Sequence, residues 1–167
     1  MQVIAVVLFI FVNILGINAG TNFNATWTFS CPAGQSIYRI KSVHSNHHAD
    51  RSWSFYCRYD SKISTSCSWS SYVNWFDQEI LYQCGDGVIS GVHSYHSNHH
   101  EDRQFKFRCC HLKKSCLKNC LWTSYVNDWD AYMNSALSYG YFLVGANSVH
   151  HNGREDRRWR FLICKQG

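Results

Sequence analysis

The segment 93–109, HSYHSNHHEDRQFKFRC, decides the fold because versions of it occur three times in the chain. The other two copies are KSVHSNHHADRSWSFYC at 41–57 and NSVHHNGREDRRWRFLI at 147–163. The arginines at the same position of each copy are 52 and 54 residues apart (Arg51, Arg103 and Arg157). Self-similarity at a fixed period indicates a repeat architecture.

Each copy carries the same residue types at fixed offsets. A serine, a histidine and an asparagine precede an Asp-Arg pair, and aromatic residues follow two and four positions after the arginine. We expect the Asp and Arg side chains to tie the turn before the aromatic strand by charge-assisted hydrogen bonds, and the other polar residues to satisfy the loop backbone. The predicted structural residues are Asp50, Arg51, Trp53, Asp102, Arg103, Phe105, Asp156, Arg157 and Trp159.

The pattern after each arginine is that of an extended chain. Aromatic and polar residues alternate with period two in RSWSFYC, RQFKFRC and RRWRFLIC, as in a half-buried strand, and 36–43 and 87–94 also read as strands. We therefore predict an all-β, disulfide-bonded fold of three repeats of about 53 residues, closed with pseudo-threefold symmetry so that sheet edges are not exposed. A β-prism of three sheets is favoured, and a β-trefoil is the alternative. The predicted core aromatics are Trp53, Phe55, Phe105, Phe107, Trp159 and Phe161.

The beginning of the chain predicts a secreted protein. Residues 1–19 are almost wholly apolar and are followed by Gly20, which is typical of a signal peptide rather than of a membrane anchor, and no later stretch is apolar enough for a span. The rest, 20–167, is predicted to be one domain of three repeats, about 20–60, 67–112 and 120–167. The sequon at Asn24 is a candidate glycosylation site in a secreted chain.

Nine cysteines fit an oxidising compartment. Repeat equivalence pairs Cys31 with Cys57 and Cys84 with Cys109. Because adjacent strand residues face opposite sides, Cys110 needs a different partner from Cys109. The remaining pairs are then Cys67–Cys110 and Cys120–Cys164. Cys116 is left over, and is either free or a site of intermolecular disulfide formation that gives a homodimer.

Several chemistries are not supported by the sequence. The cysteine spacings match no zinc finger or ribbon. Gly153 and Arg154 replace the histidine pairs of the other copies, which excludes one metal per repeat but not a metal between copies. No activated nucleophile or paired carboxylates stand outside the repeated motif, so we predict neither an enzyme nor a cofactor.

Polar residues that vary between copies are better candidates for ligand contacts. They are His47, His48, His99, His100, Arg154 and Glu155. The net charge of +5 and the pI of about 8.7 favour extracellular polyanions over nucleic acid, although a solvated surface explains the charge equally well. If these histidines bind a polyanion, affinity should rise as the pH falls below about 6.5. Four tryptophans are further candidates for stacking on sugars (Trp69, Trp75, Trp122 and Trp129).

With these motifs the chain resembles the dermatopontin family. The resemblance rests on the threefold D-R-x-[W/F]-x-F strand, on the CC…C…CLW run at 109–122 and on YHSNHHEDR at 95–103, which is similar to invertebrate hemagglutinin/amebocyte aggregation factors. It implies a secreted, non-enzymatic matrix or adhesion protein whose partners are glycosaminoglycans, proteoglycans, collagen or cell-surface glycoproteins. The family pattern also implies a later cysteine as the partner of Cys116, which the final CKQG does not supply.

These observations lead to one main functional hypothesis and two alternatives. The main one is a lectin-like extracellular protein that binds glycans or proteoglycans, without nucleic-acid binding or membrane insertion. The first alternative is an innate-immune lectin that agglutinates cells. The second is a structural matrix component that binds collagen or biomineral and has no defined sugar site.

Overall fold

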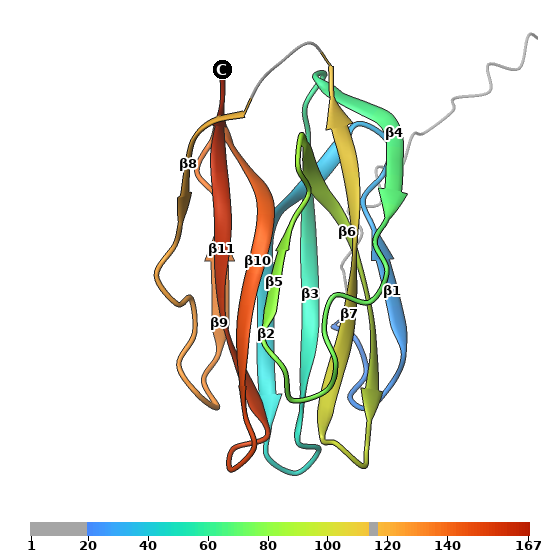
Figure 1. Cartoon of the computed structure of the whole chain (residues 1–167), viewed down its shortest axis with the longest axis vertical. Helices are drawn as coiled ribbons and strands as arrows, with labels where there is room; N and C mark the ends of the chain where they lie inside the picture. Colours follow the sequence, from blue (N-terminus) through green and yellow to red (C-terminus); the bar gives the residue numbers. More distant parts are fainter. Residues whose placement is uncertain (1–19, 114–116) are drawn as a thin grey trace, which may run out of the picture.

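The computed structural model describes residues 20–113 and 117–167 and confirms the all-β prediction (Figure 1). Its strands are β1 (Trp27–Ser30), β2 (Gln35–Ser45), β3 (Asp50–Tyr59), β4 (Ile63–Trp69), β5 (Ile80–Gln83), β6 (Gly87–Ser97), β7 (Asp102–Leu112), β8 (Leu117–Trp122), β9 (Met133–Ala136), β10 (Tyr141–His151) and β11 (Asp156–Gln166). Among the described residues no helix is long and apolar enough to cross a membrane. The predicted signal peptide, 1–19, and Cys116 lie outside the described residues.

Three long antiparallel hairpins, β2–β3, β6–β7 and β10–β11, form the centres of the sheets. They correspond to the three sequence copies, and equivalent residues pair in each: Ser42 with Trp53, Ser94 with Phe105, and Ser148 with Trp159. Each hairpin also has a register shift at the same place, after Ile37, Ile89 and Leu143. The period-two pattern of the sequence is therefore the alternation of a strand with one face in the core.

Each repeat contributes one short strand to the sheet of another repeat. β1 pairs with β6, β5 pairs with β10, and β9 pairs with β2, so the three exchanges form a closed cycle. The resulting sheets have the orders β1-β6-β7-β4, β5-β10-β11-β8 and β3-β2-β9. No repeat can therefore complete its own sheet alone. The β-prism arrangement and its β-trefoil alternative stay predictions.

The core lies where the three hairpins face one another. All six aromatic residues that the repeat pattern predicts for the core are buried. The first aromatic ring of each strand meets the other two, with ring-centre distances of 5.3 Å for Trp53–Trp159, 5.0 Å for Phe105–Trp159 and 6.0 Å for Trp53–Phe105. All three contacts are edge-to-face, an arrangement in which the positive edge of one ring meets the negative face of another.

Four disulfides join the pairs that the repeat register predicts. Cys67–Cys110 and Cys120–Cys164 each link two neighbouring strands of one sheet, β4 to β7 and β8 to β11. Cys31–Cys57 and Cys84–Cys109 instead link a residue just after an exchanged strand to the central hairpin of its own repeat. These two bridges hold different sheets together.

The third repeat has apolar residues where the other repeats have the inter-sheet bridge. Leu137 follows β9 as Cys31 follows β1, and Ile163 occupies on β11 the position of Cys57 on β3. Both side chains are partly buried and pack against the main core. Apolar packing thus replaces the disulfide at this junction.

Candidate functional site

Three buried ion pairs connect the repeats in a ring. Each repeat arginine binds the aspartate of a different repeat and not the aspartate next to it in the sequence. The Nε–Oδ1 distances are 2.6 Å for Arg51–Asp156, 2.6 Å for Arg103–Asp50 and 2.7 Å for Arg157–Asp102. A second N–H of each guanidinium binds Oδ2 of the same carboxylate. The pairing is therefore bidentate, the strongest geometry available to these groups.

The same aspartates also order the segments that precede the exchanged strands. Backbone N–H groups of Asn24, Asp77 and Asp130 donate to Oδ2 of Asp50, Asp102 and Asp156, respectively. Burial by itself would raise the pKa of Asp102. The hydrogen bonds and charge of Arg157 outweigh burial, with help from His150, and they hold that pKa below its usual range.

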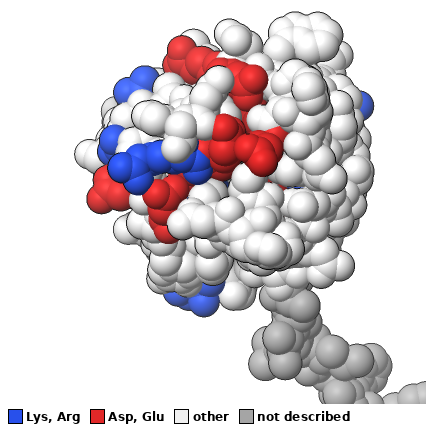
Figure 2. Space-filling view, turned by 90° about the horizontal axis from the view of Figure 1, so that it is seen from below, with Lys and Arg blue, Asp and Glu red and all other residues white. Residues whose placement is uncertain are grey.

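The ion-pair ring gathers the turns of the three hairpins at one end of the molecule (Figure 1). The residue before each aspartate has a φ of 46° (Ala49, Glu101 and Glu155). Figure 2 shows this end, where acidic side chains lie near the centre with basic groups beside them. The six candidate ligand residues from the sequence all belong to these turns, so the structure brings them to one end face. Its charge is mixed rather than uniformly basic.

Two of the turns present equivalent stacked ring systems. His48 lies on Phe23 with 4.7 Å between ring centres and 13° between planes, and His100 lies on Phe76 at 4.5 Å and 10°. His47 and His99 contact these histidines edge-on. Sequence reasoning did not find the phenylalanines, although each stands at the same place in FNA and FDQ.

The third turn differs in charge and shape. Arg154 donates to Asp130 at 2.7 Å, and His151 contacts Trp129 edge-on at 5.3 Å. Burial raises the pKa of Glu155, and the negative charges of Glu101, Asp77 and Asp102 raise it further. The Glu155 carboxylate therefore stands in a locally negative environment.

Two flanking segments, 69–76 and 122–129, lie along the outer side of the second and third hairpins. The N–H of Val73 donates to the Phe105 carbonyl, and that of Val126 donates to the Trp159 carbonyl. The side chain of Asn74 accepts from the Phe105 N–H. Asn127 does the same for Trp159. These bonds explain why YVN occurs in both segments.

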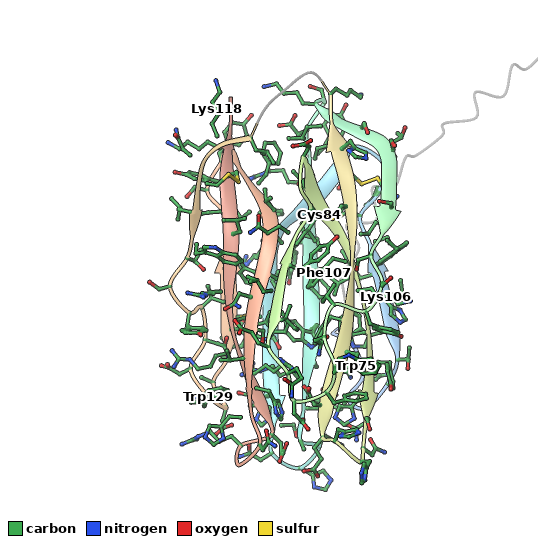
Figure 3. All side chains as sticks on the ribbon, in the orientation of Figure 1. Trp75, Cys84, Lys106, Phe107, Lys118 and Trp129 are labelled. Carbon is green, nitrogen blue, oxygen red and sulfur yellow. A yellow bond between two sulfur atoms is a disulfide. The ribbon has the colours of Figure 1, made fainter. Side chains whose placement is uncertain are left out.

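The flanking segments place aromatic rings over cations of the hairpin strands. Lys106 Nζ lies 4.4 Å from the Tyr72 ring centre, and Arg158 Cζ lies 4.3 Å from that of Tyr125. We call these the cation–aromatic strips. The second-repeat strip consists of Trp69, Tyr72, Trp75 and Lys106, and the third-repeat strip consists of Trp122, Tyr125, Trp129, Arg158 and Arg160. Figure 3 labels Lys106, Trp75 and Trp129.

The third-repeat strip is the more strongly basic of the two. Arg158 also approaches Trp129 at 5.7 Å, and Arg160 approaches Trp122 at 5.5 Å. An exposed acid, Asp128, lies 3.6 Å from Arg158. Alternating guanidinium and aromatic groups offer donors to anionic oxygens together with flat apolar faces.

The second-repeat strip exposes more ring surface. Trp75 is 79% exposed, and Trp69 and Tyr72 are each 40% exposed. His93 borders Tyr72, with 3.2 Å between Nε2 and the phenol oxygen. Burial lowers the pKa of His93, and the positive charge of Lys106 lowers it further. Both effects favour the neutral form of this histidine.

The geometry can support recognition of extended polar ligands. Sugars offer apolar ring faces to aromatic side chains and hydroxyl or acidic groups to directional donors. The cation–aromatic strips combine aromatic rings and directional donors on the outer faces of the sheets. The turns offer imidazole rings near mixed charge. The strip tryptophans include the four that the sequence suggested for stacking.

Comparison with known proteins places these features in a family. The dermatopontin family profile matches residues 21–167. The chain is 40% identical to the hemagglutinin/amebocyte aggregation factor of Limulus polyphemus, over 96% of this chain and 95% of the relative. It is 41% identical to dermatopontin of Biomphalaria glabrata, over 82% and 93%. It is 38% identical to Millepora cytotoxin-1 of Millepora dichotoma, over 85% of this chain but 64% of that protein. No solved structure matches.

Proposed function

Because the chain belongs to the dermatopontin family, we propose that it is a non-enzymatic extracellular protein that binds anionic glycans in cell adhesion or agglutination. Its relatives include a dermatopontin and a hemagglutinin/amebocyte aggregation factor. Beyond family membership, we propose the ligand class, anionic glycans, and the contact surface, which is formed by the side chains of the two cation–aromatic strips.

The observation that carries the proposal is the recurrence of one cation–aromatic contact in two repeats. Lys106 lies 4.4 Å from the Tyr72 ring centre, and Arg160, at the equivalent position of the third repeat, lies 5.7 Å from that of Tyr125. Arg158 adds a further cation 4.3 Å from the Tyr125 ring centre. Core packing does not account for these contacts, because Tyr72 and Tyr125 are exposed and the three cations are only half-buried. Sulfated or carboxylated sugars would place their anionic groups on the cations and their rings against the aromatic side chains.

Two strips on one chain supply the multivalency that agglutination requires. They belong to different sheets, β1-β6-β7-β4 and β5-β10-β11-β8. A long polysaccharide or two cell surfaces could therefore be held by one molecule, with avidity above the affinity of either strip. The histidine turns are a second contact region, which would gain affinity for anions as their imidazoles become protonated.

Heparin binding tests the proposal. The disulfide-intact protein would be loaded on immobilised heparin and eluted with salt at about pH 7.4 and at about pH 6.0. The double variant Arg158→Ala/Arg160→Ala should weaken binding at least about tenfold, because two charge-assisted contacts are lost. Arg39→Ala/Lys41→Ala is the matched control. It also removes two cations next to a tyrosine, Tyr56, but in the repeat without a tryptophan-bearing strip.

The outcomes separate the two contact regions. Salt-sensitive retention that falls in the Arg158/Arg160 variant and not in the control supports the strips. Equal losses of heparin affinity in both variants would show that retention depends only on net charge, and this would contradict a defined site. Retention that depends on His47, His48, His99 and His100 and strengthens at the lower pH would move the site to the turns. Flow-through at both pH values would reject anionic glycans as ligands.

A further inference from the structure

The three junctions between repeats are equivalent in backbone but differ in one side chain. At two junctions a histidine near the end of a hairpin strand, His44 on β2 or His150 on β10, lies close to the residue that precedes the exchanged strand of another repeat. The residues that precede the three exchanged strands are Asn24, Asp77 and Asp130, whose backbone N–H groups make the same hydrogen bond to a ring aspartate. The junctions can therefore be compared directly for charge.

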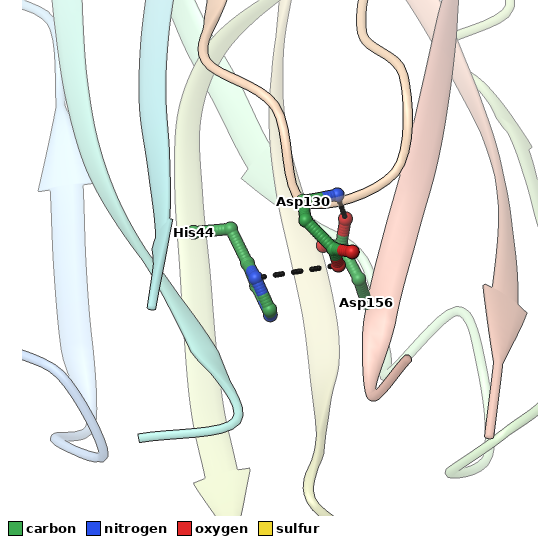
Figure 4. Close-up of side chains that lie close together, drawn as sticks. All are labelled: His44, Asp130 and Asp156. Carbon is green, nitrogen blue, oxygen red and sulfur yellow. Dashed lines mark hydrogen bonds and ion pairs between the residues drawn. The ribbon is translucent and has the colours of Figure 1, made fainter. Parts of the chain in front are cut away.

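The junction at Asp130 is electrically compensated. His44 Nδ1 lies 3.5 Å from Asp130 Oδ1 (Figure 4). Nε2 of the same ring lies 3.2 Å from the Glu155 carbonyl oxygen. Arg154 binds the other Asp130 oxygen at 2.7 Å. Arg51 compensates Asp156 in the same way. Each carboxylate at this junction thus has its own arginine, and the junction at Asn24 lacks the second carboxylate.

The junction at Asp77 has more carboxylates than arginines. His150 Nδ1 lies 3.5 Å from Asp77 Oδ1, and its Nε2 lies 3.6 Å from Glu155 Oε2 and 3.9 Å from Asp102 Oδ1. Arg157 compensates only Asp102. At the position of Arg154 the second repeat has His100, whose Nδ1 is 3.8 Å from Asp77 Oδ2.

Buried polar atoms at this junction lack partners. The His150 side chain is 1% exposed, yet Nε2 has no hydrogen-bond partner among the described residues, and neither has the buried Asp77 Oδ1. The other ring nitrogen, Nδ1, is held by the Asn152 side-chain oxygen at 3.2 Å. A buried imidazole fixed at one nitrogen and open at the other is the usual arrangement of a metal-binding histidine with its supporting group.

We propose that this junction binds one divalent metal ion, Zn²⁺ by preference, between the second and third repeats. Asp77, Asp102 and His150 each bring one ligand atom within 4.8 Å of the other two, and Glu155 approaches Nε2 of the imidazole, as Asp102 does. Ligand atoms about 2.0–2.2 Å from a tetrahedral zinc lie about 3.3–3.6 Å apart, so small side-chain movements complete the site. Mixed imidazole and carboxylate ligands favour zinc over calcium, which prefers oxygen alone.

The ion would serve the assembly of the repeats. It would join His150 and Glu155 of the third repeat to Asp77 and Asp102 of the second, beside the Arg157 ion pair. Its two positive charges would balance the carboxylates of Asp77 and Glu155. The equivalent group formed by His44, Asp130 and Asp156 also has ligand-like spacing, but Arg154 already occupies Asp130.

Titration calorimetry with ZnCl₂ tests the site on chelator-treated, disulfide-intact protein. To remove surface binding, the titrations use a background in which His47, His48 and His99 are replaced by alanine. The expected result is saturation at one zinc per chain and a rise in the melting temperature, because only the folded state binds. CaCl₂ is titrated in parallel and should bind at least about a hundredfold more weakly, owing to the imidazole ligand.

The matched variants are Asp77→Asn and Asp130→Asn, which remove the same group at equivalent junctions. Asp77→Asn should abolish the stoichiometric site and the melting-temperature rise, whereas Asp130→Asn should keep both. Circular dichroism of the metal-free variants shows whether each is folded. Absence of one-to-one binding in the parent, tighter binding of calcium, or equal loss in both folded variants would overturn the proposal. If Asp77→Asn does not fold, His150→Gln provides the same comparison against His44→Gln.

Discussion

Arg103 of the second repeat binds Asp50 of the first through two hydrogen bonds of 2.6 and 2.7 Å, and both side chains are almost fully buried. The same hydrogen bond, from arginine Nε to aspartate Oδ1, occurs at the other two junctions. Because each arginine reaches into another repeat, the ion pairs couple the three hairpins as the exchanged strands do. The turns that carry the histidines start directly from this ring.

Replacing Arg103 with Met should lower the free energy of unfolding by about 3–5 kcal/mol, because Asp50 would be left as an uncompensated buried charge. Urea denaturation followed by tryptophan fluorescence measures the change. Arg154→Ala breaks an ion pair of similar length whose arginine is 50% exposed, and it should cost at most about 1 kcal/mol. Similar losses in the two variants would show that burial does not set the energy of the ring.

The apolar junction of the third repeat should accept an engineered disulfide. Leu137→Cys/Ile163→Cys places cysteines at the positions equivalent to Cys31–Cys57 and Cys84–Cys109, whose Cα atoms are 5.7 and 5.5 Å apart. The new bridge should form on oxidative folding and raise stability by about 2–3 kcal/mol.

Non-reducing peptide mapping identifies this bridge, and denaturation with and without reductant gives its effect. Each single cysteine variant is the control for lost apolar packing. Failure of the double variant to form the bridge, with the four native bridges intact, would mean that the third junction differs in geometry from the other two.

Glu155→Gln should stabilise the metal-free protein at neutral pH. The folded state raises the pKa of Glu155 above its ordinary value of 4.5, chiefly by burial and then by Glu101, Asp77 and Asp102, with His151 acting in the opposite direction. A raised carboxyl pKa means that the folded state binds the proton more tightly than the unfolded state. Stability from this group is therefore present below pH 4.5 and is lost as the pH rises through the folded pKa.

Thermal unfolding in the presence of a chelator, at about pH 7 and at about pH 4, checks the direction in which Glu155 changes the stability. The advantage of Glu155→Gln over the parent should be present at the higher pH and vanish at the lower one. Asp128→Asn, at a side chain that is 87% exposed, should change stability by no more than about 0.5 kcal/mol at either pH. A variant less stable than the parent at neutral pH would contradict the assignment.

Asn24 should carry an N-linked glycan when the protein is made in a eukaryotic secretory pathway. Asn24 is exposed. Its backbone N–H, and not its side chain, makes the hydrogen bond to Asp50, so the side-chain amide stays available for glycosylation. Intact mass before and after glycosidase treatment measures occupancy. Thr26→Ala should remove the glycan without altering the asparagine, and an unmodified parent chain would refute the prediction.

The sequence alone predicted the strands that follow the repeat arginines, the aromatic core and the disulfide partners. These features depend on local alternation and on repeat equivalence, both of which can be read along the chain: Trp53, Phe105 and Trp159 stand two residues after each arginine. The resemblance to the dermatopontin family followed from the same residues. The six candidate ligand residues of the turns could be named because they vary where their neighbours do not.

Only the tertiary structure decided which repeat each side chain serves. Arg103 pairs with Asp50 rather than Asp102, and β1 pairs with β6, because both contacts span repeats and leave no periodic signal in the sequence. For the same reason, the sequence did not reveal the stacking of Phe76 on His100 or the contact of His150 with Asp77. Equivalent repeats look alike in sequence, whereas the charge at each junction depends on which two of them meet.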